Sequence, residues 1–317
     1  MALELKAKDG GTGGVQRILL DCIDKALQTL AGRRPLRDQA VHQARKELKR
    51  ARAALRLWRD GLSVAVYRRE NAALRDASTP LTEVRDARVV LDTIDSLLEH
   101  FAAAAKGIAL DDFRRRLRKE RLQLRRAILQ SPHPLAASRR TLGQCRQRVA
   151  RQPRHRDAWT VYGAGVQRIY RSGRRGFANA RRDRSAEALH DWRKSVKYLR
   201  HQLQILRPIW PGPIGELADQ AHMLTVYLGE DHDLWVLRER MTQHGDVLPD
   251  EASRSALAAL VDRRRQELQD CALALGERLY LEKPGEFTRR LGEYWLNWRR
   301  ESDSRKAQPI PEAHPPA

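Results

Sequence analysis

The chain has 317 residues, 41% of them hydrophobic, which is enough for two ordinary domains or for one domain built from two similar halves. Its 61 lysines and arginines against 40 acidic residues give a net charge of +21, which indicates an anionic partner such as nucleic acid, polyphosphate or an acidic membrane surface. Cys22, Cys145 and Cys271 fit neither a disulfide framework nor a zinc knuckle, which favours a reducing cytoplasm. The start lacks the apolar core of a signal peptide, and no stretch is long enough to span a bilayer, so no membrane insertion is expected.

Helical periodicity dominates the first half of the chain. The glycine-rich residues 1–14 are expected to be disordered, and the apolar residues between Val15 and Leu30 then repeat at the spacing of an amphipathic helix. Further helices are expected at about 41–60, 64–77, 82–105, 111–130 and, after the proline-containing break at 131–134, up to about 150.

The second half repeats this pattern. Helices are expected at about 154–171, 189–206, 214–228, 231–244, 250–281 and 284–301. The segment GRRGFANARRD at 173–183 is predicted to form a loop, and the proline-containing tail 303–317 is predicted to be disordered. No segment alternates as a strand does, so the sequence predicts an all-α fold.

A line of basic residues lies on two of these helices, and we call the two lines the basic stripes. VHQARKELKRARAALRLW (41–58) and LHDWRKSVKYLRHQLQIL (189–206) align without gaps. The shared positions of positive charge are His42/His190, Arg45/Arg193, Lys46/Lys194, Lys49/Lys197 and Arg52/Arg200. Each stripe starts one residue after an apolar seam and therefore lies about 100° around the helix from it. A stripe in that position flanks the packed core, where a groove between helices can form.

Most basic stripes are solvated surfaces, but the composition of these two favours a binding role. Only Glu47 offers an opposite charge near the first stripe, and like charges at helical spacing repel by a few tenths of a kcal/mol per pair. A bound linear phosphate chain would offset this repulsion through arginine forks and lysine point charges. His42 and His190 would then donate to phosphate oxygens, so affinity is expected to fall with salt and to rise as the pH drops through the histidine range.

The pattern H-x-x-R-(K)-x-x-K-(R)-x-R on two amphipathic helices resembles the CHAD (conserved histidine α-helical domain) family. The similarity extends to LTEVRDARVVLDTI (81–94) and LGEDHDLWVLRERM (228–241), in which Asp86 corresponds to Asp233. The resemblance covers about residues 15–302. It implies two helical bundles, 15–150 and 154–302, related by a pseudo-twofold axis and enclosing a central basic channel that binds inorganic polyphosphate.

Carried over residue by residue, the resemblance assigns polyphosphate contact to both basic stripes. The assigned residues are His42, Arg45, Lys46, Lys49, Arg50, Arg52 and Arg56 in the first half, and His190, Arg193, Lys194, Lys197 and Arg200 in the second. The wall of the channel that the second half supplies is less basic than the first. Tyr198 matches Arg50, Gln204 matches Arg56 and His232 matches Arg85. The expected location is the cytoplasm, in association with polyphosphate granules.

Two further groups of charged residues have more than one interpretation. Arg114, Arg118, Arg121 and Arg125 form another positive line, which either widens the channel or faces water. Asp86 and Asp233 are expected at helix starts, where a carboxylate caps free N–H groups or orients a neighbouring arginine rather than catalysing a reaction.

The sequence provides little support for a metal site or for catalysis. Lys46 and Lys194 occupy the positions one turn after each histidine where a second metal ligand would be needed. No Walker loop, GxSxG elbow or paired acidic motif occurs, and ELKAK at 4–8 has one carboxylate where a CYTH triphosphate enzyme needs two. We therefore expect no catalytic residues, cofactor or metal. An accessory role beside a triphosphate- or polyphosphate-processing enzyme is a weaker alternative.

Nucleic-acid binding through the phosphate backbone is the main alternative function. Phosphate contacts alone give affinity for RNA and DNA. Proteins that bind single strands usually add stacking aromatic residues, and only 6% of this chain is aromatic. Weak, unspecific nucleic-acid binding is the form of this alternative that the composition allows.

Overall fold

The computed structural model describes residues 3–32, 38–130, 132–243 and 250–307, and within these ranges it contains helices and connections but no strand. The all-α prediction is thus confirmed. The helices of the first half are α1 (Gly13–Leu30), α2 (Asp38–Leu57), α3 (Val64–Asp76), α4 (Thr79–His100), α5 (Asp111–Arg125) and α6 (Pro132–Ala150). Those of the second half are α7 (Ala158–Arg182), α8 (Ala186–Leu206), α9 (Pro211–Gln243), α10 (Glu251–Leu279) and α11 (Pro284–Ala307). Single turns, η1 (Arg59–Gly61), η2 (Arg126–Gln130) and η3 (Arg207–Ile209), follow α2, α5 and α8.

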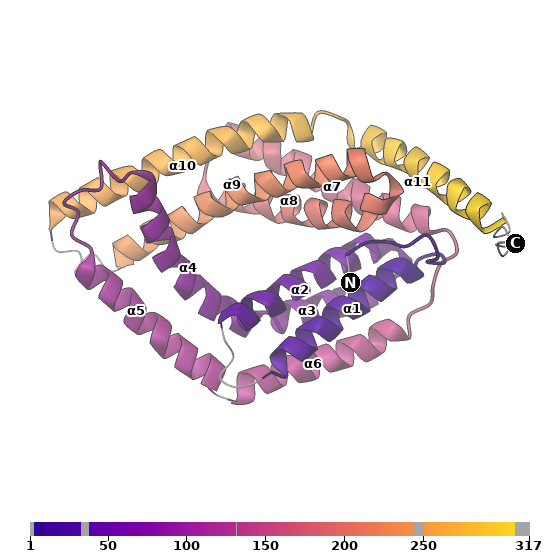
Figure 1. Ribbon diagram of the computed structural model, residues 1–317, viewed down its shortest axis with the longest axis horizontal. Coiled ribbons are helices and arrows are strands. Elements are labelled where there is room, and N and C mark those ends of the chain that lie inside the picture. The colour runs from indigo at the N-terminus through magenta and orange to yellow at the C-terminus, as the bar shows by residue number, and fades with distance from the viewer. Residues whose placement is uncertain (1–2, 33–37, 131, 244–249, 308–317) are drawn as a thin grey trace, which may run out of the picture.

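The molecule is elongated, with the two stripe-bearing helices at its centre. Helices α2 and α8 contact each other, while α4 and α5 lie at one end of the long axis and α11 lies at the other (Figure 1). Local side-chain caps fix several helix starts. Ser63 accepts a hydrogen bond from the backbone N–H of Val66 at the start of α3, and Ser185 does the same for Ala188 at the start of α8.

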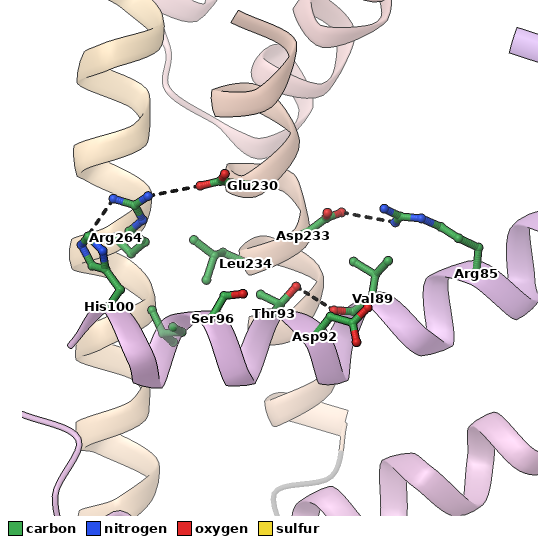
Figure 2. A pocket seen from close by; sticks show the side chains of 11 residues that line it. Arg85, Val89, Asp92, Thr93, Ser96, His100, Glu230, Asp233, Leu234 and Arg264 are labelled. Carbon is green, nitrogen blue, oxygen red and sulfur yellow. Dashed lines mark hydrogen bonds and ion pairs between the residues drawn. The ribbon is translucent and has the colours of Figure 1, made fainter. Parts of the chain in front are cut away.

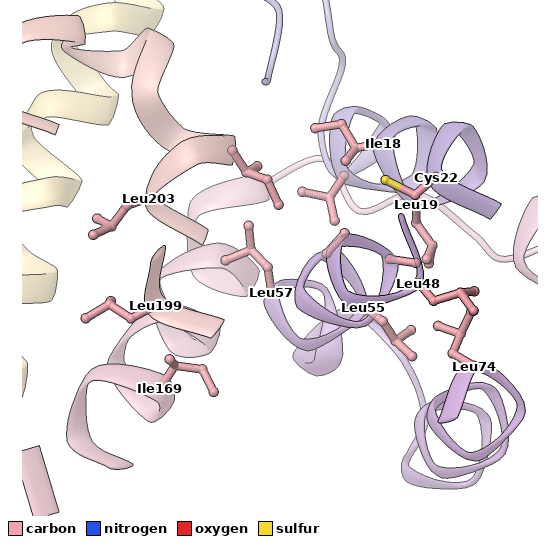
Figure 3. Packing of buried hydrophobic residues seen from close by; sticks show 14 of the residues in the cluster. Ile18, Leu19, Cys22, Leu48, Leu55, Leu57, Leu74, Ile169, Leu199 and Leu203 are labelled. Carbon is pink, nitrogen blue, oxygen red and sulfur yellow. The ribbon is translucent and has the colours of Figure 1, made fainter. Parts of the chain in front are cut away.

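Two hydrophobic cores hold the helices together, and each draws on both halves of the chain. The larger core packs α1, α2, α3 and α6 against α7, α8, α11 and the first turns of α9. Figure 3 shows Leu48, Leu55 and Leu57 of α2 on one side of it and Leu199 and Leu203 of α8 on the other. The smaller core packs α4 and α5 against α9 and α10, and both Ile94 of α4 and Leu237 of α9 belong to it.

Both cores join the halves 15–150 and 154–302, for which the resemblance implies two bundles. Helices α4 and α5 belong to the first half by sequence, yet their apolar faces are buried against α9 and α10 of the second half. A hydrophobic face is stabilised wherever it loses contact with water, and the chain position of its partner does not matter. A pseudo-twofold relation between the halves stays a prediction.

The prediction of a loop at 173–183 is wrong, because α7 continues through this segment to Arg182. Its two glycines serve close packing rather than chain reversal. A Cβ atom at Gly176 would lie 2.9 Å from the Cα atom of Trp192 in α8, and one at Gly173 would overlap the hydroxyl group of Tyr280. Glycine is needed at both positions because large aromatic side chains press against the α7 backbone.

The break predicted near residue 229 is absent as well, since α9 runs without interruption from Pro211 to Gln243. The buried residues Leu228, Asp231 and Leu234 keep one face of α9 against its neighbours across this point. Asp231 accepts hydrogen bonds from Arg265 at 3.1 Å and from Gln269 at 2.8 Å, both on α10. These contacts between helices outweigh the small cost of one glycine inside a helix.

The two chain ends are more ordered than the sequence predicts, as far as the structure describes them. Leu5 is only 4% exposed, and its backbone N–H donates to the carbonyl oxygen of Ile205 at 3.0 Å, so Leu3 and Leu5 pack on the larger core. Helix α11 continues to Ala307, past the expected end at 301. Residues 308–317 of the predicted disordered tail lie outside the described residues.

Substitution of two glycines by alanine should show how closely the halves approach each other. A Cβ atom at Gly165 of α7 would lie 2.7 Å from the carbonyl oxygen of Leu57 in α2, so the two backbones would have to separate. We expect Gly165→Ala to lower the free energy of unfolding by about 1–3 kcal/mol. Gly143 of α6 has open space around it, so Gly143→Ala should raise the stability by about 0.5–1 kcal/mol through helix propensity alone. Denaturant unfolding of both variants measures the difference, and equal effects would contradict the close contact.

Candidate anion-binding site

The two basic stripes face a common cavity between α2 and α8, which we call the central basic cavity. Its volume is about 560 Å³. Arg45, Lys49, Arg52 and Arg56 of α2 and Lys194 and Lys197 of α8 supply its positive charge. Ser172 of α7 and Ser78 and Thr82, where α3 gives way to α4, line it as well. The apolar seams of both helices are buried in the larger core, and this packing turns the flanking stripes towards each other.

Two lysines at the centre of the cavity are held in an unfavourable environment. Burial, followed by the guanidinium group of Arg45, lowers the pKa of Lys49 from 10.5 to about 8. Burial and the ammonium group of Lys49 lower the pKa of Lys197 well below its ordinary value. The ammonium groups of the two lysines thus repel each other across the α2–α8 contact, and an anion bound between them would offset this repulsion.

Arg85 of α4 joins both stripes to the same cluster. Its charge lowers the pKa of Lys49 on α2 and of Arg193 on α8, behind burial as the largest cause in each case. Its Nη1 atom lies 3.9 Å from Oδ1 of Asp86 and 4.0 Å from Oδ1 of Asp233, distances that leave both ion pairs loose. The repeat aligns Arg85 with His232, and Arg85 is not among the residues predicted to contact polyphosphate. The Arg-Asp pair in the repeated segment was the signal that could have identified it.

Several buried donor atoms in this region have no hydrogen-bond partner. They include Nη1 of Arg45, Nε of Arg193 and Nδ1 of His190. Buried polar groups are nearly always satisfied in folded proteins, and leaving one unsatisfied costs about 1–3 kcal/mol. Buried nitrogen atoms without partners on both stripes are therefore candidates to bind ligand oxygens.

The two stripe histidines lie at the edge of the cluster. Burial and the charge of Arg85 lower the pKa of His42, and burial and Lys194 lower that of His190. The ring of His190 lies 4.7 Å from the ring of His232 on α9, whose pKa burial lowers to about 3. The rise in affinity that the sequence predicts through the histidine range is therefore expected at lower pH than an unperturbed imidazole would give.

Tyr198 of α8 holds the two outermost arginines of the α2 stripe. The guanidinium carbon of Arg56 lies 4.0 Å from the centre of the Tyr198 ring, and that of Arg52 lies 5.9 Å away. Both arginines also donate to Oδ1 of Asn71 on α3, Arg56 at 2.8 Å and Arg52 at 3.4 Å. Tyr198, which the alignment of the halves treated as a missing cation, thus fixes two cations of the opposite wall.

Six of the twelve assigned residues do not line the central basic cavity: His42, Lys46, Arg50, His190, Arg193 and Arg200. Arg50 donates to Oε1 of Glu47 at 2.9 Å, because that carboxylate is buried and needs an opposite charge. Arg200 lies near Arg50 and Asp219. Lys194 lines the cavity and pairs with Asp191 at 2.8 Å, whereas Lys46 is exposed at the start of the stripe.

The arginines of α5 brace the fold instead of lining the cavity. Arg114 donates to Asp95 of α4 at 2.5 Å, and Arg121 and Arg125 both bind Asp38, the first residue of α2. Arg118 is exposed. These ion pairs attach α5 to the neighbouring helices, so the structure does not bring this line of charge into the channel.

The capping role expected for Asp86 and Asp233 is wrong, because both residues lie inside helices, α4 and α9. Their alternative role, orienting an arginine, is supported by the position of Arg85 between them. Oδ1 of Asp86 also lies 3.9 Å from Nη2 of Arg45. Burial raises the pKa of Asp233, and the charge of Arg85 works in the opposite direction.

A second cavity of about 390 Å³ lies between α4, α9 and α10 (Figure 2). Arg85 and Asp233 line it, so it adjoins the cluster around Arg193. Its other charges are mutually compensated, as in the pair of Arg264 with Glu230 at 3.2 Å. Across the described ranges, no three His, Cys, Asp or Glu side chains are arranged to hold a metal ion, and no helix there is long and apolar enough to cross a membrane.

Comparison with known proteins identifies one family. The model of the CHAD domain matches residues 17–242, which includes both basic stripes. A crystal structure of the CHAD domain from the plant Ricinus communis is similar over 87% of this chain and 95% of that chain, with a TM-score of 0.62 and 20% identity. That likeness concerns the fold alone. No curated protein matches the sequence.

Proposed function

The chain belongs to the CHAD family, and from this premise we propose that it binds inorganic polyphosphate in the central basic cavity without cleaving it. The proposal rests on one observation: the two basic stripes, on α2 and α8, face the same cavity. Arg45 and Lys49 of α2 share one electrostatic cluster with Arg193 and Lys197 of α8, and only loose or peripheral carboxylates accompany them. A linear chain with a negative charge on every unit can satisfy all four at once.

Binding is favoured over catalysis by what the cavity lacks. Asp191 is the one carboxylate among its described lining residues, and Lys194 already pairs with it. Metal-assisted phosphoryl transfer requires carboxylates that hold divalent cations beside the phosphates. A protein of this kind would retain polyphosphate, and association with polyphosphate granules in the cytoplasm would follow from that.

The aromatic residue of the cavity, Tyr198, favours polyphosphate over nucleic acid as the ligand. The ring of Tyr198 is covered by the guanidinium group of Arg56 and is therefore occupied as a stacking surface for a base. A ribose or base would also increase the width of the ligand between two helices that are in contact. Phosphate units without substituents need less room there.

A competition titration tests the proposal. Long-chain polyphosphate, single-stranded RNA and duplex DNA are compared at equal phosphate concentration and fixed salt. We expect polyphosphate to bind at least about tenfold more tightly than either nucleic acid, with an affinity for polyphosphate that falls steeply with salt. Equal or tighter binding of nucleic acid would reverse the assignment. Release of orthophosphate in the presence of Mg²⁺ would contradict the absence of cleavage.

A further inference from the structure

Lys49 lies in the middle of the line of arginines that α2 presents to the central basic cavity. Arg45 precedes it by four residues and Arg52 follows it by three, so guanidinium groups lie one turn away on either side along the helix. The cavity, of about 560 Å³, leaves room for a small molecule beside this amine. Lys194 lines the same cavity and is held by Asp191 at 2.8 Å, whereas Lys49 forms no ion pair within the described ranges. Lys49 therefore offers an amine without a fixed partner.

The environment of this amine makes it a nucleophile at neutral pH. Burial, followed by the charges of Arg45, Arg85 and Arg193 on three different helices, lowers the pKa of Lys49 to about 8, and the charge of Asp86 opposes this only in part. At pH 7 about a tenth of the Lys49 amines are therefore neutral, against fewer than about one in a thousand for an ordinary lysine. Loss of solvent and neighbouring cations are the two usual ways in which a lysine is activated as a nucleophile.

Arg45 supplies a phosphate-binding group next to this nucleophile. The side chain is buried, and its Nη1 atom has no hydrogen-bond partner. Its Nη2 atom lies 3.9 Å from Oδ1 of Asp86, which is too long for a hydrogen bond. A guanidinium group binds phosphate oxygens through paired, charge-assisted hydrogen bonds. A phosphate group held by Arg45 thus brings whatever is attached to it within reach of Lys49.

We propose that Lys49 is a site of covalent acylation by acyl phosphates, the small mixed anhydrides of a carboxylic acid and phosphoric acid. Arg45 holds the phosphate group while the neutral Nζ atom of Lys49 attacks the acyl carbon. The C–N bond forms, and the bond between the acyl carbon and the bridging oxygen breaks. The proton of the amine passes to the leaving phosphate, so the products are an amide and hydrogen phosphate, and no further reactant is needed.

Acylation changes the charge of the central basic cavity. The amide is neutral, so the modification removes one cation from the middle of the α2 stripe and fills the space beside it. The acylated protein should therefore bind polyphosphate at least about tenfold more weakly. This consequence rests on the proposed function, whereas the acylation itself requires only that the cavity accepts one phosphate group. Polyphosphate binding would thus respond to the supply of activated acyl groups.

The probe is acetyl phosphate, and mass spectrometry of peptides gives the rate of acetylation at each lysine. We expect Lys49 to react at least about tenfold faster than Lys119, which is exposed on α5, and than Lys194, which lines the same cavity. This ratio is smaller than the ratio of neutral amines, because a less basic amine is also a weaker nucleophile. p-Nitrophenyl acetate, an acyl donor without a phosphate group, should show a much smaller preference for Lys49, since Arg45 has no anion to hold.

Arg45→Gln separates recognition of the phosphate group from activation of the amine. Loss of the Arg45 charge affects the amine of Lys49 equally towards both acyl donors. We therefore expect the rate at Lys49 to fall at least about fivefold more with acetyl phosphate than with p-nitrophenyl acetate. Arg139→Gln is the matched control, since Arg139 is exposed on α6 and does not line the cavity, and it should change neither rate.

Three outcomes would overturn the proposal. Lys49 could react no faster than Lys119, p-nitrophenyl acetate could show the same preference for Lys49 as acetyl phosphate does, or Arg45→Gln could lower both rates equally. Polyphosphate is absent from these reactions, so an unreactive Lys49 in a protein that binds polyphosphate would refute the acylation alone. Selective acylation in a protein that does not bind polyphosphate would refute the proposed function alone.

Discussion

Replacing Arg45, Lys49, Arg193 and Lys197 by alanine is expected to weaken polyphosphate binding at least about 100-fold while leaving the helical content unchanged. Each of these side chains contributes a charge-assisted contact, and such contacts are worth about 1.5–3 kcal/mol each when they are desolvated. Their removal also abolishes the mutual repulsion between the stripes, so the unliganded fold should not be weakened. Binding is measured at fixed pH and salt, and circular dichroism reports the helical content.

A second quadruple variant separates this local effect from the loss of net charge. Arg139, Arg140, Arg171 and Arg175 are exposed on α6 and α7 and do not line the central basic cavity. Their replacement by alanine removes the same number of positive charges. We expect it to lower the affinity for polyphosphate by less than about tenfold, through long-range electrostatics alone. If both variants bind equally weakly, the ligand is held by general charge and the cavity is not the binding site.

Lys49→Met is expected to raise the free energy of unfolding by about 3 kcal/mol at pH 7 in the absence of ligand. The reason is the depressed pKa of Lys49, which is 10.5 in an unfolded chain and about 8 in the fold. Below pH 8 the folded protein must hold a buried ammonium group beside Arg45, and methionine replaces that group by an apolar side chain of similar length. The same substitution should reduce the stabilisation that polyphosphate gives to the protein, since one phosphate contact is lost.

The stabilising effect of Lys49→Met should depend on pH. Between pH 8 and 10.5 the unfolded chain binds the proton on Lys49 and the folded chain does not, so the stability of the unchanged protein should rise with pH in this window. The difference from Lys49→Met should therefore close by about pH 10.5. Lys119→Met, at an exposed position of α5, is the control and should change the stability by less than about 0.5 kcal/mol. A destabilised Lys49→Met protein at pH 7 would show that the ammonium group is not under strain.

The depressed pKa of Lys49 also makes polyphosphate binding sensitive to alkaline pH. A bound anion favours the protonated amine, so binding takes up protons once the free protein has lost them. The contribution of Lys49 to affinity should stay nearly constant below pH 8 and fall above it. This alkaline loss distinguishes the lysine from the two histidines, which act at lower pH.

The sequence determined the features that depend on residues close together in the chain. The amphipathic period of α2 and α8 placed Val41, Ala44 and Leu48, and likewise Leu189 and Trp192, on the buried seams where the structure has them. It also placed the cationic stripes beside those seams, because the angle between neighbouring helix positions is set by backbone geometry alone. The helical class and most of the candidate lining residues of the cavity followed from this local regularity.

Only the tertiary structure decided which of these charges share a cavity and which serve the fold. Arg50 binds the buried carboxylate of Glu47, whereas Arg45 is buried and lines the central basic cavity. Arg85 reaches both stripes because α4 packs on α9 of the other half. The predicted loop at 173–183 is helical for a related reason, since its glycines admit aromatic side chains from α8 and from the end of α10. Contacts between distant segments have no period in the sequence: they depend on the total apolar area that the helices can bury together, and that area is a property of the whole chain.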